Sequence, residues 1–184
     1  MTARYALAMT KNALLQTATK EEYSNLTVLC FMFYKAIIQT PIGKIGISTI
    51  DQLITRLDFL NGDRALIDPN EEIVESIVNQ LNQYFQDPSF QFNIPYQLQG
   101  TPFQNKVWQT LSKLPKQKTV SYGSLAQQLK TGARAIGNAC RANPLPILIP
   151  CHRVIAQGSL GGYLGKEISI KKWLLNHEFC TSTF

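Results

Sequence analysis

The sequence predicts an α/β domain over residues 1–97, followed by a mostly α-helical domain with a helix-turn-helix over residues 98–184. Strand-like segments rich in β-branched residues occupy the first half. Short amphipathic segments with helical spacing occupy the second half. Between the two halves runs a polar, glutamine-rich connector from Asp87 to Gln99 that contains two prolines. We therefore place the domain boundary in this connector.

The first half is predicted to form an antiparallel meander followed by one helix. Turn residues separate three strand-like segments, which are Leu26–Thr40, Gly43–Ser48 and Leu53–Leu60. After Asp68-Pro69, an acidic first turn and apolar residues at helical spacing predict a helix that ends near Gln86. Residues 1–24 carry no motif and are interpreted as an extension. We expect no catalytic residue in this half.

The second half is predicted to begin with a helix from about Phe103 that ends before Pro115, with Trp108 in the core. Ser121 is a suitable N-cap for a helix over Tyr122–Lys130. A turn at Thr131-Gly132 and a helix over Ala133–Ala142 complete the pattern typical of a helix-turn-helix, although ordinary helix pairs share it. The last helix is predicted over Ser169–His177, with an inward face formed by Ile170, Trp173, Leu174 and His177.

Charge is distributed unevenly between the halves. Residues 1–97 contain seven Lys/Arg and ten Asp/Glu, and residues 98–184 contain eleven and two, so net charges of −3 and +9 sum to +6. A strongly basic half favours a polyanionic partner, and the alternative is a solvated face without a ligand. Arg134 and Arg141, seven residues apart on the helix of small residues, are expected on nearly one face, where they suit a DNA groove.

Composition narrows the class of protein. The longest apolar run, Leu26–Tyr34, is too short to span a bilayer, and no signal peptide is evident, so we expect a cytoplasmic protein, nucleoid-associated in a prokaryote. The cysteines have no CxxC spacing and are accompanied by only two histidines. We therefore expect free thiols, no metal site and no cofactor. The cysteines are Cys30, Cys140, Cys151 and Cys180.

A thiol and an imidazole are adjacent at Cys151-His152, at the end of a short apolar run. Thiolate is the nucleophilic form, and we expect His152 and Arg153 to raise its fraction. Prolines at 144, 146 and 150 predict a stiff, extended segment before the cysteine. The alternative is a buried structural cysteine beside a hydrogen-bonded histidine. His177, next to Glu178, remains the rival imidazole.

Two further features flank this segment. Asn143 ends the preceding helix, where its amide can bond backbone on both sides of the turn, or can be an ordinary cap. The glycine-rich loop Gly158–Gly165, which contains Tyr163, can approach a flat ligand closely, or can be a plain surface loop.

The second half carries a set of short motifs, which are Gly100-Thr101-Pro102-Phe103-Gln104, Val107-Trp108, Ser121-Tyr122, Arg134-Ala135-Ile136-Gly137, Asn143-Pro144, Pro150-Cys151-His152-Arg153-Val154 and Trp173-Leu174-Leu175-Asn176-His177-Glu178. Together these motifs resemble those of the O6-alkylguanine-DNA alkyltransferases. The closest similarity covers residues 98–184, and from about Tyr34 to 97 it holds only in outline. The resemblance implies a ribonuclease-H-like α/β domain followed by a winged-helix-like helix-turn-helix domain.

The resemblance also implies a reaction, in which an alkyl group passes irreversibly and once per molecule from guanine O6, and from thymine O4, to Cys151. His152 would be the base, bridged to the sulfur by water, with Glu178 orienting it and Asn143 as the hinge amide. Tyr122 would turn the target phosphate, and Arg134 would replace the extruded base. The further DNA contacts implied are Ser121, Arg141 and Gln104, and the implied pocket residues are Tyr163, Gly162, Cys140 and Arg153. The implied partner is duplex DNA with O6-alkylguanine, bound by a monomer.

The sequence departs from the family pattern in places. Gln117 stands where a glycine is common, so that turn is expected to differ. Leu164 and Lys166 stand where small residues are usual, which bears on pocket size. No N-terminal zinc-cysteine module is evident, which disfavours a transcriptional sensor. The alternatives are a non-catalytic binder of alkylated DNA, which lacks the acceptor cysteine, and a cysteine hydrolase, which is disfavoured because neighbouring residues rarely point at each other.

Overall fold

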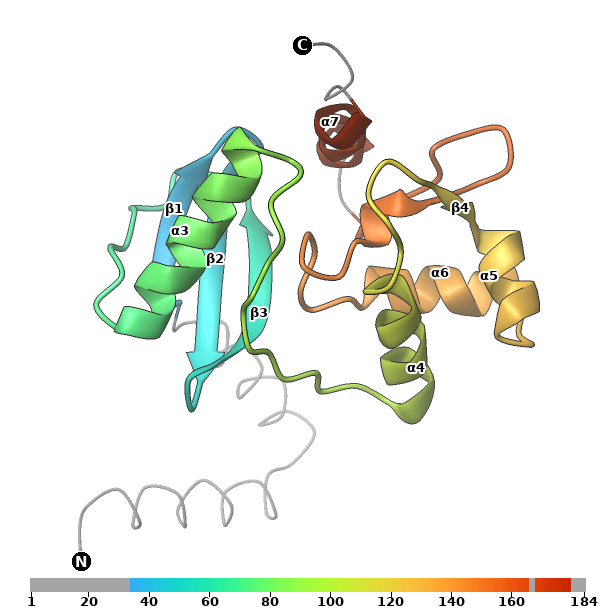
Figure 1. Cartoon of the computed structure of the whole chain (residues 1–184), viewed down its shortest axis with the longest axis horizontal. Coiled ribbons are helices and arrows are strands. Elements are labelled where there is room, and N and C mark those ends of the chain that lie inside the picture. The colour runs from blue at the N-terminus through green and yellow to red at the C-terminus, as the bar shows by residue number, and fades with distance from the viewer. Residues whose placement is uncertain (1–33, 166–167, 180–184) are drawn as a thin grey trace, which may run out of the picture. The chain divides into compact units, whose positions relative to one another are not determined.

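The computed structural model describes residues 34–165 and 168–179. Its sheet is the predicted antiparallel meander, with β1 (Ala36–Thr40), β2 (Gly43–Ile50) and β3 (Leu53–Leu60) in that order (Figure 1). The β2–β3 hairpin turns through two residues with left-handed φ, 49° and 67°, which suits the twist of paired strands. In the described chain β1 begins at Ala36; the rest of the predicted first strand, residues 26–33, and the extension over 1–24 lie outside the described residues.

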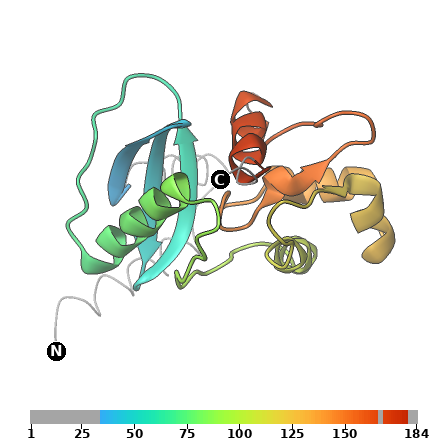
Figure 2. The ribbon, with the colours of Figure 1, turned by 45° about the horizontal axis from the view of Figure 1, so that its top comes forward.

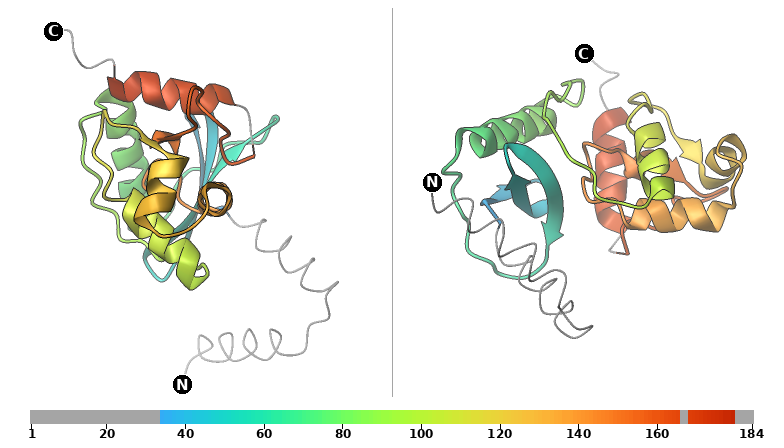
Figure 3. Two further views of the ribbon diagram at one scale, coloured as in Figure 1. Left: turned by 90° about the vertical axis from the view of Figure 1, so that its right-hand side faces the viewer. Right: turned by 90° about the horizontal axis from the view of Figure 1, so that it is seen from below.

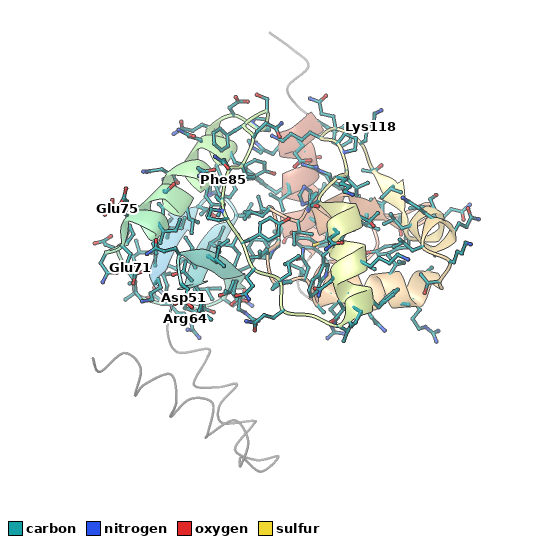
Figure 4. The ribbon with its side chains drawn as sticks, turned by 60° about the horizontal axis from the view of Figure 1, so that its bottom comes forward. Asp51, Arg64, Glu71, Glu75, Phe85 and Lys118 are labelled. Carbon is teal, nitrogen blue, oxygen red and sulfur yellow. The ribbon has the colours of Figure 1, made fainter. Side chains whose placement is uncertain are left out.

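Helix α3 (Glu72–Gln86) lies against this sheet (Figures 1 and 2). Acidic side chains occupy its first turn, where they interact favourably with the helix dipole, and Glu75 points outward into solvent (Figure 4). Its inward face is apolar except for the hydroxyl of Tyr84, and consists of Val74, Ile77, Leu81 and Tyr84.

The connector after α3 runs beside the sheet. The amide of Ile54 donates to the carbonyl of Pro95 at 3.0 Å, and the amide of Gln97 donates back to Ile54 at 3.1 Å. The connector therefore satisfies part of the open edge of β3.

Four helices follow the connector, which are α4 (Pro102–Leu111), α5 (Tyr122–Gln128), α6 (Ala133–Arg141) and α7 (Ile168–Phe179). Helices α5 and α6 lie next to each other (Figure 3), and α4 contacts α6 through the indole of Trp108, which donates to the carbonyl of Ala139 at 2.8 Å. Two short parallel strands, β4 (Val120–Ser121) and β5 (Val154–Ile155), bring the start of α5 close to the segment after Cys151. Trp108 is buried as predicted, whereas Phe103 is exposed.

The inward face of α7 differs from the prediction. Ile170, Trp173 and His177 are half-buried, and the buried positions are Lys171, Leu174, Leu175 and Glu178. Glu178 belongs to the helix, which continues to Phe179. A lysine and a glutamate therefore face the interior from the same helix.

The two halves share contacts within the unit formed by residues 35–184. The amide of Leu57 on β3 donates to the carbonyl of Pro144 at 2.9 Å, and the rings of Phe59 and Tyr163 lie 6.0 Å apart. In the described part of the chain, no helix has the length and apolar character needed to cross a bilayer.

Candidate active site

The segment before Cys151 forms a tight turn, and the prediction of an extended segment is wrong. The amide of Ile149 donates to the carbonyl of Leu145 at 2.8 Å, and Ile147 adopts a left-handed φ of 77°. This conformation is costly for a β-branched residue, so the surroundings must impose it. Ile147 is buried, and the turn leads directly into the one-turn 3₁₀-helix η1 (Cys151–Arg153).

Asn143 ties this turn together. Its Nδ2 donates to the carbonyl of Ile149 at 2.8 Å and to the sulfur of Cys151 at 3.1 Å, while its Oδ1 accepts from the amide of Leu145 at 3.0 Å. The side chain is buried, and it bridges the end of α6 to the thiol. An ordinary helix cap would not reach the sulfur.

Cys151 lies in the wall of a cavity of about 670 Å³. The thiol is 2% exposed, so a reaction partner must enter the cavity to reach it. Six residues that the resemblance implies as DNA contacts or pocket residues line the same cavity, and they are Ser121, Tyr122, Cys140, Arg141, Gly162 and Tyr163. They come from β4, α5, α6 and the glycine-rich loop, which places these segments around one space.

The electrostatics of Cys151 differ from the prediction of an ionised thiol favoured by Arg153. Burial raises the pKa of Cys151 to about 11, so the resting group is a thiol. The hydrogen bond from Asn143 and the charge of Lys171 oppose this effect without cancelling it. The cation that acts on the sulfur is thus Lys171.

Lys171 is a buried residue next to the site that the sequence analysis did not single out. Its side chain is fully buried, and Nζ donates to the carbonyls of Val154, Leu160 and Gly162 at 2.5, 2.6 and 3.2 Å. Its ammonium group therefore links the glycine-rich loop to β5 through hydrogen bonds. Its spacing of three and seven residues from Leu174 and Glu178, on one helix face, is the signal that could have revealed it.

His152 and Glu178 form a buried pair behind the thiol. The Nε2–H of His152 donates to Oε1 of Glu178 at 2.9 Å, and both side chains are 0% exposed. Burial lowers the pKa of His152, so its resting form is the neutral imidazole. Nδ1 of His152 is buried and has no hydrogen-bond partner within the described ranges, which leaves it as a basic nitrogen.

Arg153 belongs to this pair, and it lines a second cavity and not the one that holds Cys151. Nε donates to Oε2 of Glu178 and Nη2 to Oε1, both at 2.8 Å, and Nη1 donates to the carbonyl of Leu114 at 2.6 Å. A bidentate pair of this kind holds the carboxylate firmly. The hydrogen bonds from His152 and Arg153 overcome the effect of burial and keep the pKa of Glu178 well below its ordinary value.

The rival imidazole lies elsewhere. The Nε2–H of His177 donates to the backbone carbonyl of Tyr84 at 2.8 Å, and its ring stacks on Trp173 at 4.8 Å. Among the hydrogen bonds of residues 34–165 and 168–179, none joins Cys151 directly to His152. This agrees with the expectation that adjacent residues do not pair directly.

The residues considered for DNA contact are separated by the fold. Gln104 completes the capping box of α4, where its Oε1 accepts from the amide of Thr101 at 2.9 Å, and it does not line the cavity. Ser121 caps α5 by accepting from the amide of Ser124 at 2.9 Å. Arg134 and Arg141 are both exposed on α6, and only Arg141 lines the cavity.

Tyr122 and Cys140 face the same space in uncharged form. Burial raises the pKa of each to about 12. The hydroxyl of Tyr122 donates to the carbonyl of Gly162 at 3.4 Å, which is a weak bond that a ligand can replace.

Two departures from the family pattern occur in turns. Gln117 adopts φ 59° and Leu164 φ 49°, so non-glycine residues hold left-handed conformations that glycine favours. The turn at Gln117 thus keeps a glycine-like backbone. Lys166, Cys30 and Cys180 lie outside the described residues, and within those residues no group of three His, Cys, Asp or Glu side chains is placed to hold a metal ion.

Family profiles match both halves of the chain. A family profile described as "6-O-methylguanine DNA methyltransferase, ribonuclease-like domain" matches residues 33–98. A second, described as "6-O-methylguanine DNA methyltransferase, DNA binding domain", matches residues 102–180.

Relatives and solved structures match over similar lengths. The chain is 35% identical over 158 residues to the constitutive methylated-DNA–protein-cysteine methyltransferase of Bacillus subtilis, which covers 80% of this chain and 96% of that protein. The crystal structure of Mycobacterium tuberculosis O6-methylguanine methyltransferase is similar with a TM-score of 0.71 at 33% identity, over 80% of this chain and 93% of that one. A structure of the M. tuberculosis protein in complex with DNA gives 0.70 at 37% identity, over 78% and 91%.

Proposed function

The chain belongs to the 6-O-methylguanine DNA methyltransferase family, and from that premise we propose that it repairs DNA by direct reversal. It transfers an alkyl group from O6 of guanine, and from O4 of thymine, to the sulfur of Cys151. The observation that carries the proposal is a buried thiol in a cavity wall, beside an imidazole that a carboxylate holds. A non-catalytic binder of alkylated DNA would not need this arrangement.

The reaction is a displacement at the alkyl carbon. The sulfur of Cys151 forms a bond to that carbon while the carbon–O6 bond breaks, and guanine leaves with the electron pair and takes a proton from water. The proton that His152 receives from the thiol is afterwards released to solvent, so one proton in total passes from thiol to guanine. The thiol proton passes through a water molecule to Nδ1 of His152, which is the free basic nitrogen because Nε2 donates to Glu178. The carboxylate stabilises the imidazolium that forms.

The product determines how often the protein can act. A thioether at Cys151 has no good leaving group, so the thiol is not regenerated and each molecule acts once. The protein is therefore consumed in proportion to the lesions that it repairs.

We propose that the basic half presents the damaged base. Helices α5 and α6 act as the helix-turn-helix, Tyr122 turns the target phosphate, and Arg134 fills the stack after the base has rotated out. The exposure of Arg134 and the position of Tyr122 in the cavity wall support these roles. Ser121 and Arg141, which line the same cavity, would make further contacts with the DNA. Residues 1–97 serve as the scaffold and residues 98–184 as the acceptor domain of a monomer that acts in the cytoplasm.

The test is mass spectrometry of the intact protein after mixing with duplex DNA that contains O6-methylguanine. We expect one added methylene unit per molecule, carried by the peptide that contains Cys151. Cys151→Ala should remain unmodified while its affinity for the same duplex changes little, because the DNA-facing helix is untouched. An unmodified wild-type protein would refute the proposal.

A further inference from the structure

Tyr84 belongs to the half of the chain that contains the sheet, residues 1–97, which we call the sheet half. Its side chain contacts the buried charged cluster formed by His152, Arg153 and Glu178. It lies on the inward face of α3, is 1% exposed, and its hydroxyl donates to Oε1 of Glu178 at 3.1 Å. The two residues are 94 positions apart in the chain. A side chain of the otherwise non-catalytic half thus contacts the carboxylate that holds His152.

The carboxylate of Glu178 is held by a complete set of donors. Oε1 accepts from His152, Arg153 and Tyr84, and Oε2 accepts from Arg153. Arg153 neutralises the charge, whereas Tyr84 is a neutral donor. Because the phenol of Tyr84 also donates to Oε1, this oxygen is a weaker acceptor for the N–H of His152 than it would be without the phenol.

We propose that Tyr84 is a positioning residue for alkyl transfer, whose hydroxyl fixes Oε1 of Glu178 and keeps His152 in the neutral form with Nδ1 free. The inference rests on the proposed function, because it assigns to Tyr84 a part in the proton relay of that reaction. It also gives the sheet half a specific task, which is to complete the donor set of the carboxylate.

The surroundings hold the phenol as a donor. Burial and the charge of Glu178 raise the pKa of Tyr84 far above its ordinary value, so the hydroxyl keeps its proton. The ring is fixed on several sides, because its centroid lies 5.5 Å from that of Phe85 and 5.3 Å from those of Phe92 and His177. Figure 4 shows Phe85 on the same helix, α3. The direction of the hydroxyl is therefore set by packing.

Other charged groups around His152 do not replace the phenol. Arg153 and Lys171 both lower the pKa of His152, and Glu178 raises it. Lys116, whose Nζ lies 6.0 Å from the centre of the Tyr84 ring, interacts with Glu178 at longer range. Each of these groups remains when Tyr84 is replaced by phenylalanine, so that substitution isolates the hydroxyl.

The experiment follows the two histidines of the full-length chain by ¹⁵N NMR during a pH titration, in the wild type and in Tyr84→Phe. Without the hydroxyl, Oε1 of Glu178 attracts the imidazole proton more strongly, so we expect the pKa of His152 to rise by about half a unit or more. The acid limb of the single-turnover rate of methyl transfer should move to higher pH by the same amount. His177 is the internal reference, because it binds the backbone carbonyl of Tyr84 and not the hydroxyl.

Tyr96→Phe is the matched control, because Tyr96 lies on the connector and is 43% exposed. In this variant we expect the titration of His152 and the rate of methyl transfer to match those of the wild type. An unchanged titration of His152 in Tyr84→Phe would overturn the proposal. A lower unfolding temperature and a slower methyl transfer without a shift in the acid limb of the pH–rate profile would also overturn it, because a purely structural role gives that result. If wild-type protein accepts no methyl group, the proposed function fails instead.

Discussion

Replacing Lys171 by methionine removes a buried ammonium while keeping a side chain of similar length. The carbonyls of Val154 and Leu160 lose this donor, and that of Gly162 keeps only the weak bond from Tyr122. The bond to Val154 is buried and the other two are partly buried, so at about 1 kcal/mol for an unpaired buried carbonyl the free energy of unfolding should fall by about 1–2 kcal/mol. For a domain of this size that corresponds to a fall of about 2–8 °C in Tm.

The same substitution should slow the chemistry. The charge of Lys171 lowers the pKa of Cys151 against the effect of burial, so its loss raises that pKa further. Each unit of pKa reduces the thiolate about tenfold at a given pH. Because the glycine-rich loop also loses its attachment, we expect methyl transfer to slow by about tenfold or more.

The assay is the single-turnover rate of methyl transfer to the intact protein over a series of pH values, together with thermal unfolding. Lys172→Met is the matched control, since Lys172 is the exposed neighbour on the same helix. Should Lys171→Met protein react and unfold like the Lys172→Met protein, the ammonium would be dispensable and the reasoning would fail.

Three further predictions concern other parts of the site. The pKa of Glu178 is depressed from its ordinary value of 4.5, so its ionisation stabilises the fold above pH 4.5 and this contribution is lost as the pH falls. Glu178→Gln should therefore lower Tm near neutrality and flatten the acid part of a Tm–pH curve; a parallel curve would contradict this. Arg134→Ala should slow repair of duplex more than reaction with the free base O6-methylguanine, with exposed Lys130→Ala as the control, and equal losses would count against base extrusion. Leu164→Gly removes a left-handed leucine from the cavity wall and should raise the rate with O6-benzylguanine relative to O6-methylguanine, whereas an unchanged ratio would show that Leu164 does not limit pocket size.

Local signals in the sequence were sufficient for the regular elements. The three-stranded meander follows from short segments and the turn residues between them, and Ser121 caps α5 where its position predicted. The spacing of apolar residues also predicted α3 up to its last residue, Gln86. These features depend on neighbours in the chain, which one sequence displays.

The features that sequence reasoning missed depend on distant partners. Ile147 takes a left-handed φ because the buried turn requires it, although three prolines nearby favour an extended chain. Arg153 is bound by Glu178, 25 residues later, and by the carbonyl of Leu114, 39 residues earlier, and is absent from the lining of the Cys151 cavity. Lys171 would ordinarily be assigned to the surface, and only three converging carbonyls make its burial favourable.

In the proposed reaction each molecule acts once, and the protonated state of the thiol would limit its loss to side reactions. Burial raises the pKa of Cys151 to about 11, so little of it is ionised at pH 7 and a stray electrophile meets a poor nucleophile. In the proposed reaction a base in the cavity changes this, because the thiol proton moves to the neutral His152 as the sulfur–carbon bond forms. On that proposal, reactivity depends on an occupied cavity and an intact relay. A permanently ionised cysteine would react faster with a damaged base, but free alkylating agents would also alkylate it and inactivate the protein before it reached DNA.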